Sequence, residues 1–256
     1  MNPKRTIIIV LALHFINFAQ DLTAQVNIEK FRHDAQEERY SAEWEFNISS
    51  KTGNVDLTKI GFDLQNNLNW DNSKTLIILL GDYGWQGGRQ YSNEALIHLR
   101  HIFFPDRRIQ PESFTQIDYN KKRALEFRSL FGGGVRFQLL NEEKKVLALG
   151  GSLMYEHERI GISGLAERET DLVRLSSYFS GNIAFGEIIN WACTAYIQPY
   201  VRDFSDFRLI IDTDFQIPLT AMIAFDLSFR SRFDNMPPAN IKKHDSALNA
   251  GIAVSF

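Results

Sequence analysis

Charged side chains of both signs alternate with apolar side chains along several stretches of this 256-residue chain. If these stretches are strands, the alternation places the charges on one face and the apolar groups on the other. Enclosed charges of opposite sign can form ion pairs that fill an interior, or line a path for small polar or ionic solutes. The spacing alone leaves both outcomes open. The residues expected to face inward are Glu94, His98, Arg100, Glu126, Arg128, Arg136, Arg174, Asp212, Asp214, Asp226 and Arg230.

Serine–histidine hydrolysis has one candidate residue, His101. His101 lies two residues from both Leu99 and Phe103, so in a strand it would share the apolar face with them, near a turn. Such chemistry also needs a nearby serine nucleophile and a carboxamide that orients the imidazole ring. No spacing in the sequence supplies these groups. We therefore assign no catalytic residue and expect a protein that is not an enzyme, with a hydrolase as the less favoured alternative.

The sequence contains no motif that is typical of a metal-binding or cofactor-binding site. Asp203, Asp206 and Asp212 lie close to Arg208, but their spacing lacks the glycine and the terminal glutamate of a calcium loop. We interpret this cluster as surface-loop charge. Cys193 is the only cysteine, which excludes an internal disulfide, and no cysteine–histidine cluster suggests zinc. The sequence therefore predicts no metal and no cofactor.

Long strands must position the alternating side chains. The clearest alternation covers Ala124–Leu140, and Arg208–Ile217 and Leu219–Arg232 repeat it. A strand of about nine to eleven residues crosses a bilayer at a tilt, whereas strands of soluble sheets are usually about five or six residues long. A soluble exported β-protein remains the alternative, because its strands alternate as well.

Polar connections of unequal length separate these stretches. Short ones are expected at Lys51–Asn54, Asn69–Lys74, Pro105–Pro111, Asn141–Lys145 and near Gly181, and longer ones at Arg159–Glu169 and Phe233–Lys243. Only helices and closed barrels satisfy their backbone hydrogen bonds in lipid, and no segment after residue 24 is long and apolar enough for a membrane helix. We predict an all-β fold: a closed, antiparallel, up-and-down transmembrane β-barrel of about 12 strands, with 10 or 14 also compatible.

The N-terminal residues have the layout of a secretory signal peptide. Lys4 and Arg5 precede an apolar run, Thr6–Phe18, which is too short to span a bilayer. We expect cleavage at Ala24–Gln25, with Ala19–Gln20 as the alternative. The predicted organisation is a signal peptide over 1–24, a polar periplasmic lead-in over 25–40 and an outer-membrane barrel over 41–256.

Removal of residues 1–24 would leave the protein mildly acidic. It takes away two basic residues and one acidic residue, so 28 basic and 31 acidic residues become 26 and 30. A nucleic-acid-binding protein usually shows a basic stripe instead. We therefore expect no nucleic-acid partner.

The C-terminal strand resembles the closing strand of outer-membrane barrels. Asn249, Gly251, Val254 and Phe256 match its pattern of a polar residue, a glycine, an apolar residue and a final phenylalanine. The resemblance implies recognition by the barrel-assembly machinery and contact with outer-membrane lipid. These two are the partners that we expect.

The chain as a whole resembles the family of proposed salt-induced outer-membrane proteins, a domain of unknown function. The similarity runs over about residues 41–256. It is carried by Gly53-Asn54, residues 131–136, Gln198-Pro199, residues 206–208 and Asp245. It implies an outer-membrane barrel and a link to salt or osmotic conditions, and it supplies no catalytic residues.

Together these observations favour a small channel in the outer membrane of a Gram-negative bacterium. The alternative is a non-conducting structural or binding barrel whose long loops, 159–169 and 233–243, contact an outside partner. The sequence leaves the solute, the stimulus and the oligomeric state open.

Overall fold

The computed structural model describes residues 39–142, 144–161, 167–186, 188–220 and 222–254. Nearly all of them belong to long β-strands. The expected signal peptide, most of the polar lead-in and Phe256 lie outside the described residues. The strands are β1 Tyr40–Lys51, β2 Leu57–Trp70, β3 Ser73–Gln86, β4 Arg89–Phe103, β5 Ile109–Asn120, β6 Leu125–Glu142, β7 Lys145–Ile160, β8 Arg168–Phe185, β9 Ile189–Tyr200, β10 Asp203–Pro218, β11 Ile223–Asp234 and β12 His244–Val254.

The strands follow one another in a single up-and-down sheet. Their spatial order is β1 to β12, each hydrogen-bonded antiparallel to the next. The predicted all-β class, antiparallel topology and strand number of 12 are confirmed. Among the described residues no ladder joins β1 to β12, so closure of the barrel stays a prediction.

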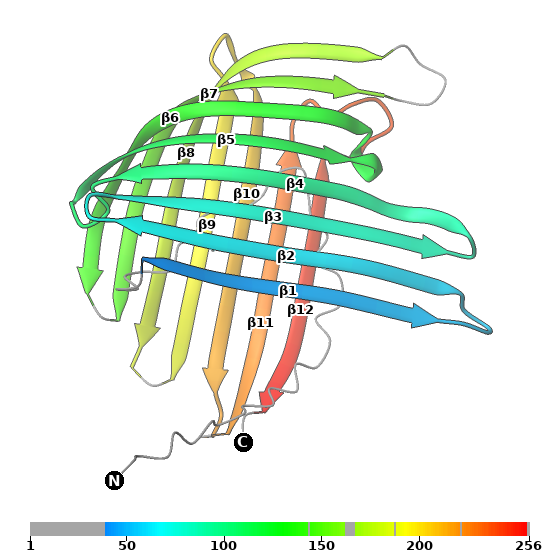
Figure 1. The fold of residues 1–256 in the computed structure, drawn as a ribbon, viewed down its shortest axis with the longest axis horizontal. Coiled ribbons are helices and arrows are strands. Elements are labelled where there is room, and N and C mark those ends of the chain that lie inside the picture. The colour runs from blue at the N-terminus through cyan, green and yellow to red at the C-terminus, as the bar shows by residue number, and fades with distance from the viewer. Residues whose placement is uncertain (1–38, 143, 162–166, 187, 221, 255–256) are drawn as a thin grey trace.

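The sheet is strongly coiled. In Figure 1 the ribbons of β1 to β5 run across the view in front, and those of β9 to β12 run steeply behind them. The right-handed twist between neighbouring strands, accumulated over so many strands, produces this coiling. Residues far apart in the strand order therefore face each other across the hollow of the sheet.

Tight turns join several strands. Gly87 and Gly88 connect β3 to β4 with φ values of 53° and 76°, a backbone conformation that glycine adopts without strain. The turn expected near Gly181 is wrong, because β8 continues through Gly181 to Phe185 and turns at Gly186, where φ is 63°. Gly181 is instead paired with Leu147 on the neighbouring strand.

A short 3₁₀ helix, η2 (Lys121–Arg123), connects β5 to β6. The Asn120 side chain caps it by accepting a hydrogen bond from the Arg123 backbone N–H at 3.2 Å. Ala124 ends it in the left-handed conformation with φ 57°. No helix in the described part of the chain is long and apolar enough to cross a membrane.

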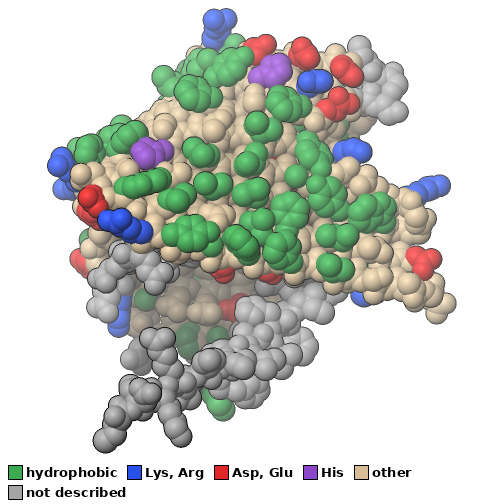
Figure 2. Space-filling view, in the orientation of Figure 1, with side chains coloured by type: hydrophobic (Ala, Val, Ile, Leu, Met, Phe, Trp, Pro, Cys, Tyr) green, Lys and Arg blue, Asp and Glu red, His purple; other side chains and the backbone are tan. Residues whose placement is uncertain are grey.

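The sheet is polar on its buried face and apolar on its exposed face, the reverse of the arrangement in a soluble protein. We call the face that carries Glu94, His98 and Arg100 the inner face, since these side chains are buried. On the outer face large apolar side chains are exposed, with Phe131 at 68% and Leu153 at 59%. Figure 2 shows hydrophobic side chains spread over the front of the molecule, with most charged side chains toward its margins. The sheet thus turns its apolar surface outward.

Candidate functional site

An ion-pair network crosses the inside of the coiled sheet. Arg208 on β10 donates to Glu156 Oε2 at 2.6 Å and to Glu158 Oε2 at 3.0 Å, both on β7. Its Nε also donates to Asp234 Oδ2 on β11 at 3.0 Å. Because β8 and β9 separate β7 from β10 in the sheet, the bonds to Glu156 and Glu158 bridge the hollow, whereas the bond to Asp234 joins directly paired residues of neighbouring strands.

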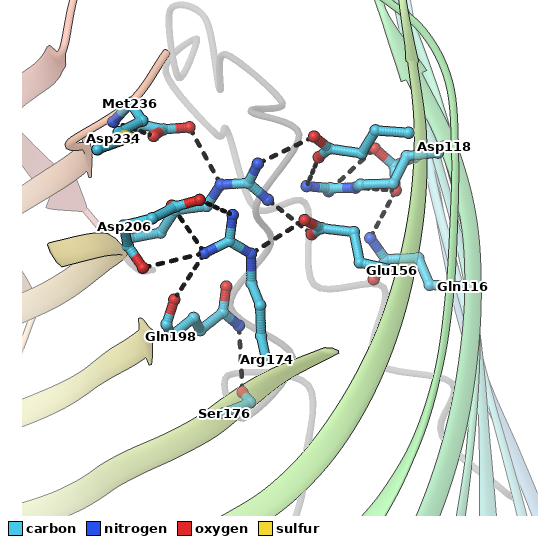
Figure 3. Close-up of polar contacts among 12 residues, drawn as sticks. Gln116, Asp118, Glu156, Arg174, Ser176, Gln198, Asp206, Asp234 and Met236 are labelled. Atoms are coloured by element: carbon cyan, nitrogen blue, oxygen red, sulfur yellow. Dashed lines mark hydrogen bonds and ion pairs between the residues drawn. The ribbon is translucent and has the colours of Figure 1, made fainter. Parts of the chain in front are cut away.

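Arg174 on β8 extends this network (Figure 3). It is almost fully buried, and its Nε donates to Glu156 Oε1 at 3.0 Å. Its Nη1 donates to Asp206 Oδ1 at 3.0 Å and to the Gln198 carbonyl oxygen at 3.2 Å. One glutamate, Glu156, therefore accepts from two arginines of different strands.

Arg128 on β6 forms the other end of the network. It lies 3.0 Å from Asp118 and 3.6 Å from Glu158, measured from guanidinium nitrogen to carboxylate oxygen. The amide of Gln116 also donates to Asp118, at 2.7 Å. Buried charges require such pairing, because taking an unpaired ion out of water costs several kcal/mol. The interior network thus joins all strands from β5 to β11, with β9 contributing the Gln198 carbonyl oxygen.

Strand register explains how these groups meet. Asp118 pairs with Arg128, and Arg128 with Glu158, in successive ladders, so the three side chains share one face. Antiparallel partners project to the same side of a sheet, with Cβ atoms about 5 Å apart. Pairing between neighbouring strands therefore fixes this end of the network, whereas the bonds of Arg208 to β7 depend on the coiling of the sheet.

Apolar side chains fill the interior beside the network. Phe114, Leu130 and Met154 form one buried cluster, and Tyr178 and Tyr196 belong to a second with Ile210. A cavity of only about 50 Å³ remains between them. The inner space between β4 and β10 is accordingly almost filled.

Glycines on β6 make this filling possible. A Cβ added at Gly132 would lie 2.5 Å from the Phe114 ring. One added at Gly134 would lie 2.1 Å from the backbone oxygen of Gly151. The missing side chains let the neighbouring strand and the Phe114 ring approach β6 closely.

The inner face is more exposed on β1 and beside β11 and β12. Glu43, Glu45 and Asn47 of β1 are exposed, although they share a face with the buried Gln65 of β2. A larger cavity, of about 370 Å³, lies between the β4–β5 end with η2 and strands β11 and β12. The interior is thus filled on one side and hollow on the other.

The residues predicted to face inward fall into three groups. Glu94, His98, Arg100, Arg128, Arg136, Arg174 and Asp212 are buried. Asp214, Asp226 and Arg230 are half-buried. Their ion pairs include Arg100 with Glu112, at 3.1 Å between Nη1 and Oε2, and Arg230 with Asp214, at 3.5 Å between Nη2 and Oδ1.

Glu126 departs from the expectation, because it is exposed and belongs to neither the buried nor the half-buried group. The ladder between β6 and β7 shifts register between Leu125 and Phe127, so the alternation that holds from Arg128 onward does not extend back to Glu126. Leu125 is buried in its place. A bulge of this kind leaves no trace in a binary hydrophobic pattern.

The sequence interpretation missed much of the network. Asp118, Glu156, Glu158 and Asp234 were not among the expected inward residues, and all are buried. The interpretation of Asp206, Arg208 and Asp212 as surface-loop charge is also wrong, because Arg208 and Asp212 are buried and Asp206 bonds Arg174. Asp203 is exposed, as that interpretation expects. The shared parity of Glu156 and Glu158 with Met154 could have revealed two of them. The assignment of a loop from residue 159 obscured that signal.

His101 has contacts of another kind. Its Nδ1 lies 2.8 Å from the Thr75 hydroxyl, and its ring packs edge-on against Phe103 with centroids 4.5 Å apart. No group of three or more metal-ligating side chains occurs among the residues that the structure describes.

The four residues of the expected C-terminal signature lie in or after β12. Asn249 and Gly251 pair with Ser228 and Asp226 and share the inner face with them, and Val254 pairs with Ile223. Ile252, between them, is 61% exposed on the outer face. Phe256 lies outside the described residues.

Comparisons with known proteins give a family and structural likenesses. The sequence profile described as "Protein of unknown function, DUF481" matches residues 44–256. No curated protein matches the chain. The chain is similar to the solved NanC porin, with 6% identity, TM-score 0.43, and coverage of 85% of this chain and 99% of that one. It is also similar to the β domain of the Bordetella autotransporter Brka, with 10% identity, TM-score 0.35, and coverage of 85% and 98%.

Proposed function

This chain belongs to the DUF481 family, whose function is unknown, and we propose that it is an outer-membrane β-barrel with a narrow path for small polar or ionic solutes. The observation that carries the proposal is the reversed polarity of the sheet. Trp44 and Phe46 are 61% and 67% exposed on the outer face, while Arg174 and Glu156 are buried on the inner face. In water such a surface would be costly, whereas in lipid it is the arrangement of a membrane barrel.

The strand lengths and directions support the same proposal. The strands contain 11 to 18 residues, which is enough to cross the hydrocarbon core at a tilt. With 12 strands in up-and-down order, β1 and β12 run antiparallel to each other. They could therefore pair and close the barrel, which would remove the two exposed sheet edges.

The less filled side of the interior supports a narrow path rather than a wide pore. The ion-pair network and the apolar clusters occupy the space between β4 and β10. The exposed Glu43, Glu45 and Asn47 and the 370 Å³ cavity lie on the other side. A solute would pass between β1–β2 and β11–β12, and the charges there would set ion selectivity.

A non-conducting structural barrel is the second candidate. The network bridging β7 and β10 favours it, since cross-lumen ion pairs also serve as a filling. The long connections around 159–169 and 233–243 would then contact a partner outside the cell.

Single-channel recording distinguishes the two candidates. The chain from Gln25 onward, refolded in detergent, would be added to a planar bilayer under a KCl gradient, beside Arg230→Gln and, as a control on the outer face, Glu169→Gln. The channel proposal predicts discrete steps, with a reversal potential that shifts toward cation selectivity in Arg230→Gln alone. Silence from a folded, heat-modifiable preparation would reject the channel and favour the structural barrel.

The link to salt or osmotic conditions is a separate proposal that rests on the family resemblance. It predicts that the amount of this protein in outer-membrane fractions rises when cells grow in added NaCl. Quantitative mass spectrometry of those fractions, normalised to other barrels, tests it. Equal amounts at low and high salt would reject the link.

A further inference from the structure

The larger cavity of the inner face, about 370 Å³ in volume, has a strongly basic lining. We call it the basic cavity. Its cationic side chains come from η2, β11 and the connection to β12: Lys122, Arg123, Arg230, Arg232 and Lys242. Glu94 and Asp245 are the acidic residues of the lining. Positive groups thus outnumber negative ones in a cavity that is partly open to its surroundings.

The ion pairs formed by the cationic side chains of the basic cavity leave part of their positive charge uncompensated. Arg232 is held by Asp212 through bonds of 2.6 and 2.9 Å. Arg230 meets Asp214 only at 3.5 Å through Nη2, and its Nη1 is buried with no hydrogen-bond partner. A buried guanidinium nitrogen without an acceptor is costly.

Arg123 and Lys242 add to the excess. Arg123 Nη2 lies 3.8 Å from Asp245 Oδ2, near the limit for an ion pair. Burial lowers the pKa of Arg123, Asp245 and Asp234 act in the opposite direction, and the nearby Arg208 and Arg128 lower it further. Lys242 has no ion-pair partner within the part of the chain that the structure describes.

We infer that the basic cavity binds a small organic anion bearing carboxylate or phosphate groups. Guanidinium groups present paired N–H donors that match the oxygens of such anions. The volume lies within the range of small-molecule pockets, about 300–1,000 Å³. The inference names a solute class for the proposed path and so rests on the proposed function.

The position of the cavity favours a dissolved anion over a lipid headgroup. Arg230 and Arg232 share the inner face with Asp212, so they point away from the apolar outer face. Asn240 and Lys242 complete the lining from the connection between β11 and β12. A ligand would therefore enter from the hollow of the sheet.

Binding can be measured without a membrane potential. Isothermal titration of the refolded chain in non-ionic detergent would use citrate and inorganic phosphate as probes, with glucose as the neutral control, at constant ionic strength. The test variant is Arg230→Gln with Lys242→Gln. The matched control is Arg107→Gln with Lys144→Gln, which also removes one arginine and one lysine but in turns outside the cavity.

The inference predicts saturable binding of citrate or phosphate and none of glucose. The cavity variant should bind about tenfold more weakly or worse, since it loses charge-assisted bonds, and the turn variant should bind as the parent does. No binding by the folded parent, or equal weakening in both variants, would overturn it. Binding without conductance would instead reject the path while leaving the anion site in place.

Discussion

Arg208 and Glu156 form a 2.6 Å ion pair between Nη1 and Oε2 although two strands separate them in the sheet. Both side chains are buried. The pair therefore ties opposite walls of the coiled sheet together, and it does so inside a network that also contains Arg174. Such ion pairs connect strands that are not adjacent, so they stabilise the curvature of the sheet, whereas hydrogen bonds between neighbouring strands do not link its opposite walls.

Glu156→Gln should destabilise the fold by about 3 kcal/mol, as breaking a buried pair usually does. Glu156 accepts from Arg174 with one oxygen and from Arg208 with the other. Glutamine offers one oxygen and one donating amide, so one arginine loses its acceptor. Urea unfolding in detergent, followed by tryptophan fluorescence, measures the change. Glu169→Gln, which breaks an exposed pair with Arg159, serves as the control, and equal stability of both variants would contradict this role.

Gly134→Ala should cost about 1–3 kcal/mol, since the added methyl group would clash with backbone. Its Cβ would lie 2.1 Å from the Gly151 oxygen and 2.5 Å from Ser152 Cα. Gly151→Ala is the matched change on the facing strand, where a Cβ meets nothing within 4 Å. The same unfolding assay should show little loss there. If Gly151→Ala were the more damaging change, the close approach of β6 and β7 at Gly134 would be refuted.

Closure of the barrel predicts contact between β1 and β12. In a Cys193→Ser background, Glu45→Cys would be combined in turn with cysteine at Asp245, Ala247, Asn249 and Gly251, all on the inner face. One register should give a disulfide on mild oxidation, because only Cα atoms within about 7 Å can be bridged. Ser228→Cys with Asn249→Cys, which pair directly in the sheet, is the positive control. Success of that control and failure of all four seam pairs would mean an open sheet.

The sequence allowed the long strands, their number and the two faces to be predicted. Alternation over residues such as Phe131, Phe137 and Leu139 marks an outward face without reference to any partner. Most of the connections also follow from polar, glycine- or proline-containing segments. These signals are local in the sequence, so strands and connections can be predicted from them without knowing how the sheet coils.

The network could not be predicted in the same way. Whether Asp206 and Arg208 belong to a loop or to the interior depends on β10 starting at Asp203, which no local pattern fixes. The contact of Arg208 with Glu156 depends on the coiling of the whole sheet. Glu126 was misplaced by a register shift that only the pairing of β6 with β7 shows.

A nitroxide scan along β7 tests whether the sheet turns an apolar face to lipid and a charged face inward. Single cysteines from Leu149 to His157, in a Cys193→Ser background, would be spin-labelled in lipid bilayers. Collisions with oxygen and with a water-soluble nickel chelate would be compared. We expect a period of two, with high oxygen and low nickel accessibility at Leu149, Leu153 and Tyr155 and low values for both at Met154 and Glu156. High nickel accessibility at the three outward positions would contradict this expectation and indicate a sheet that faces water.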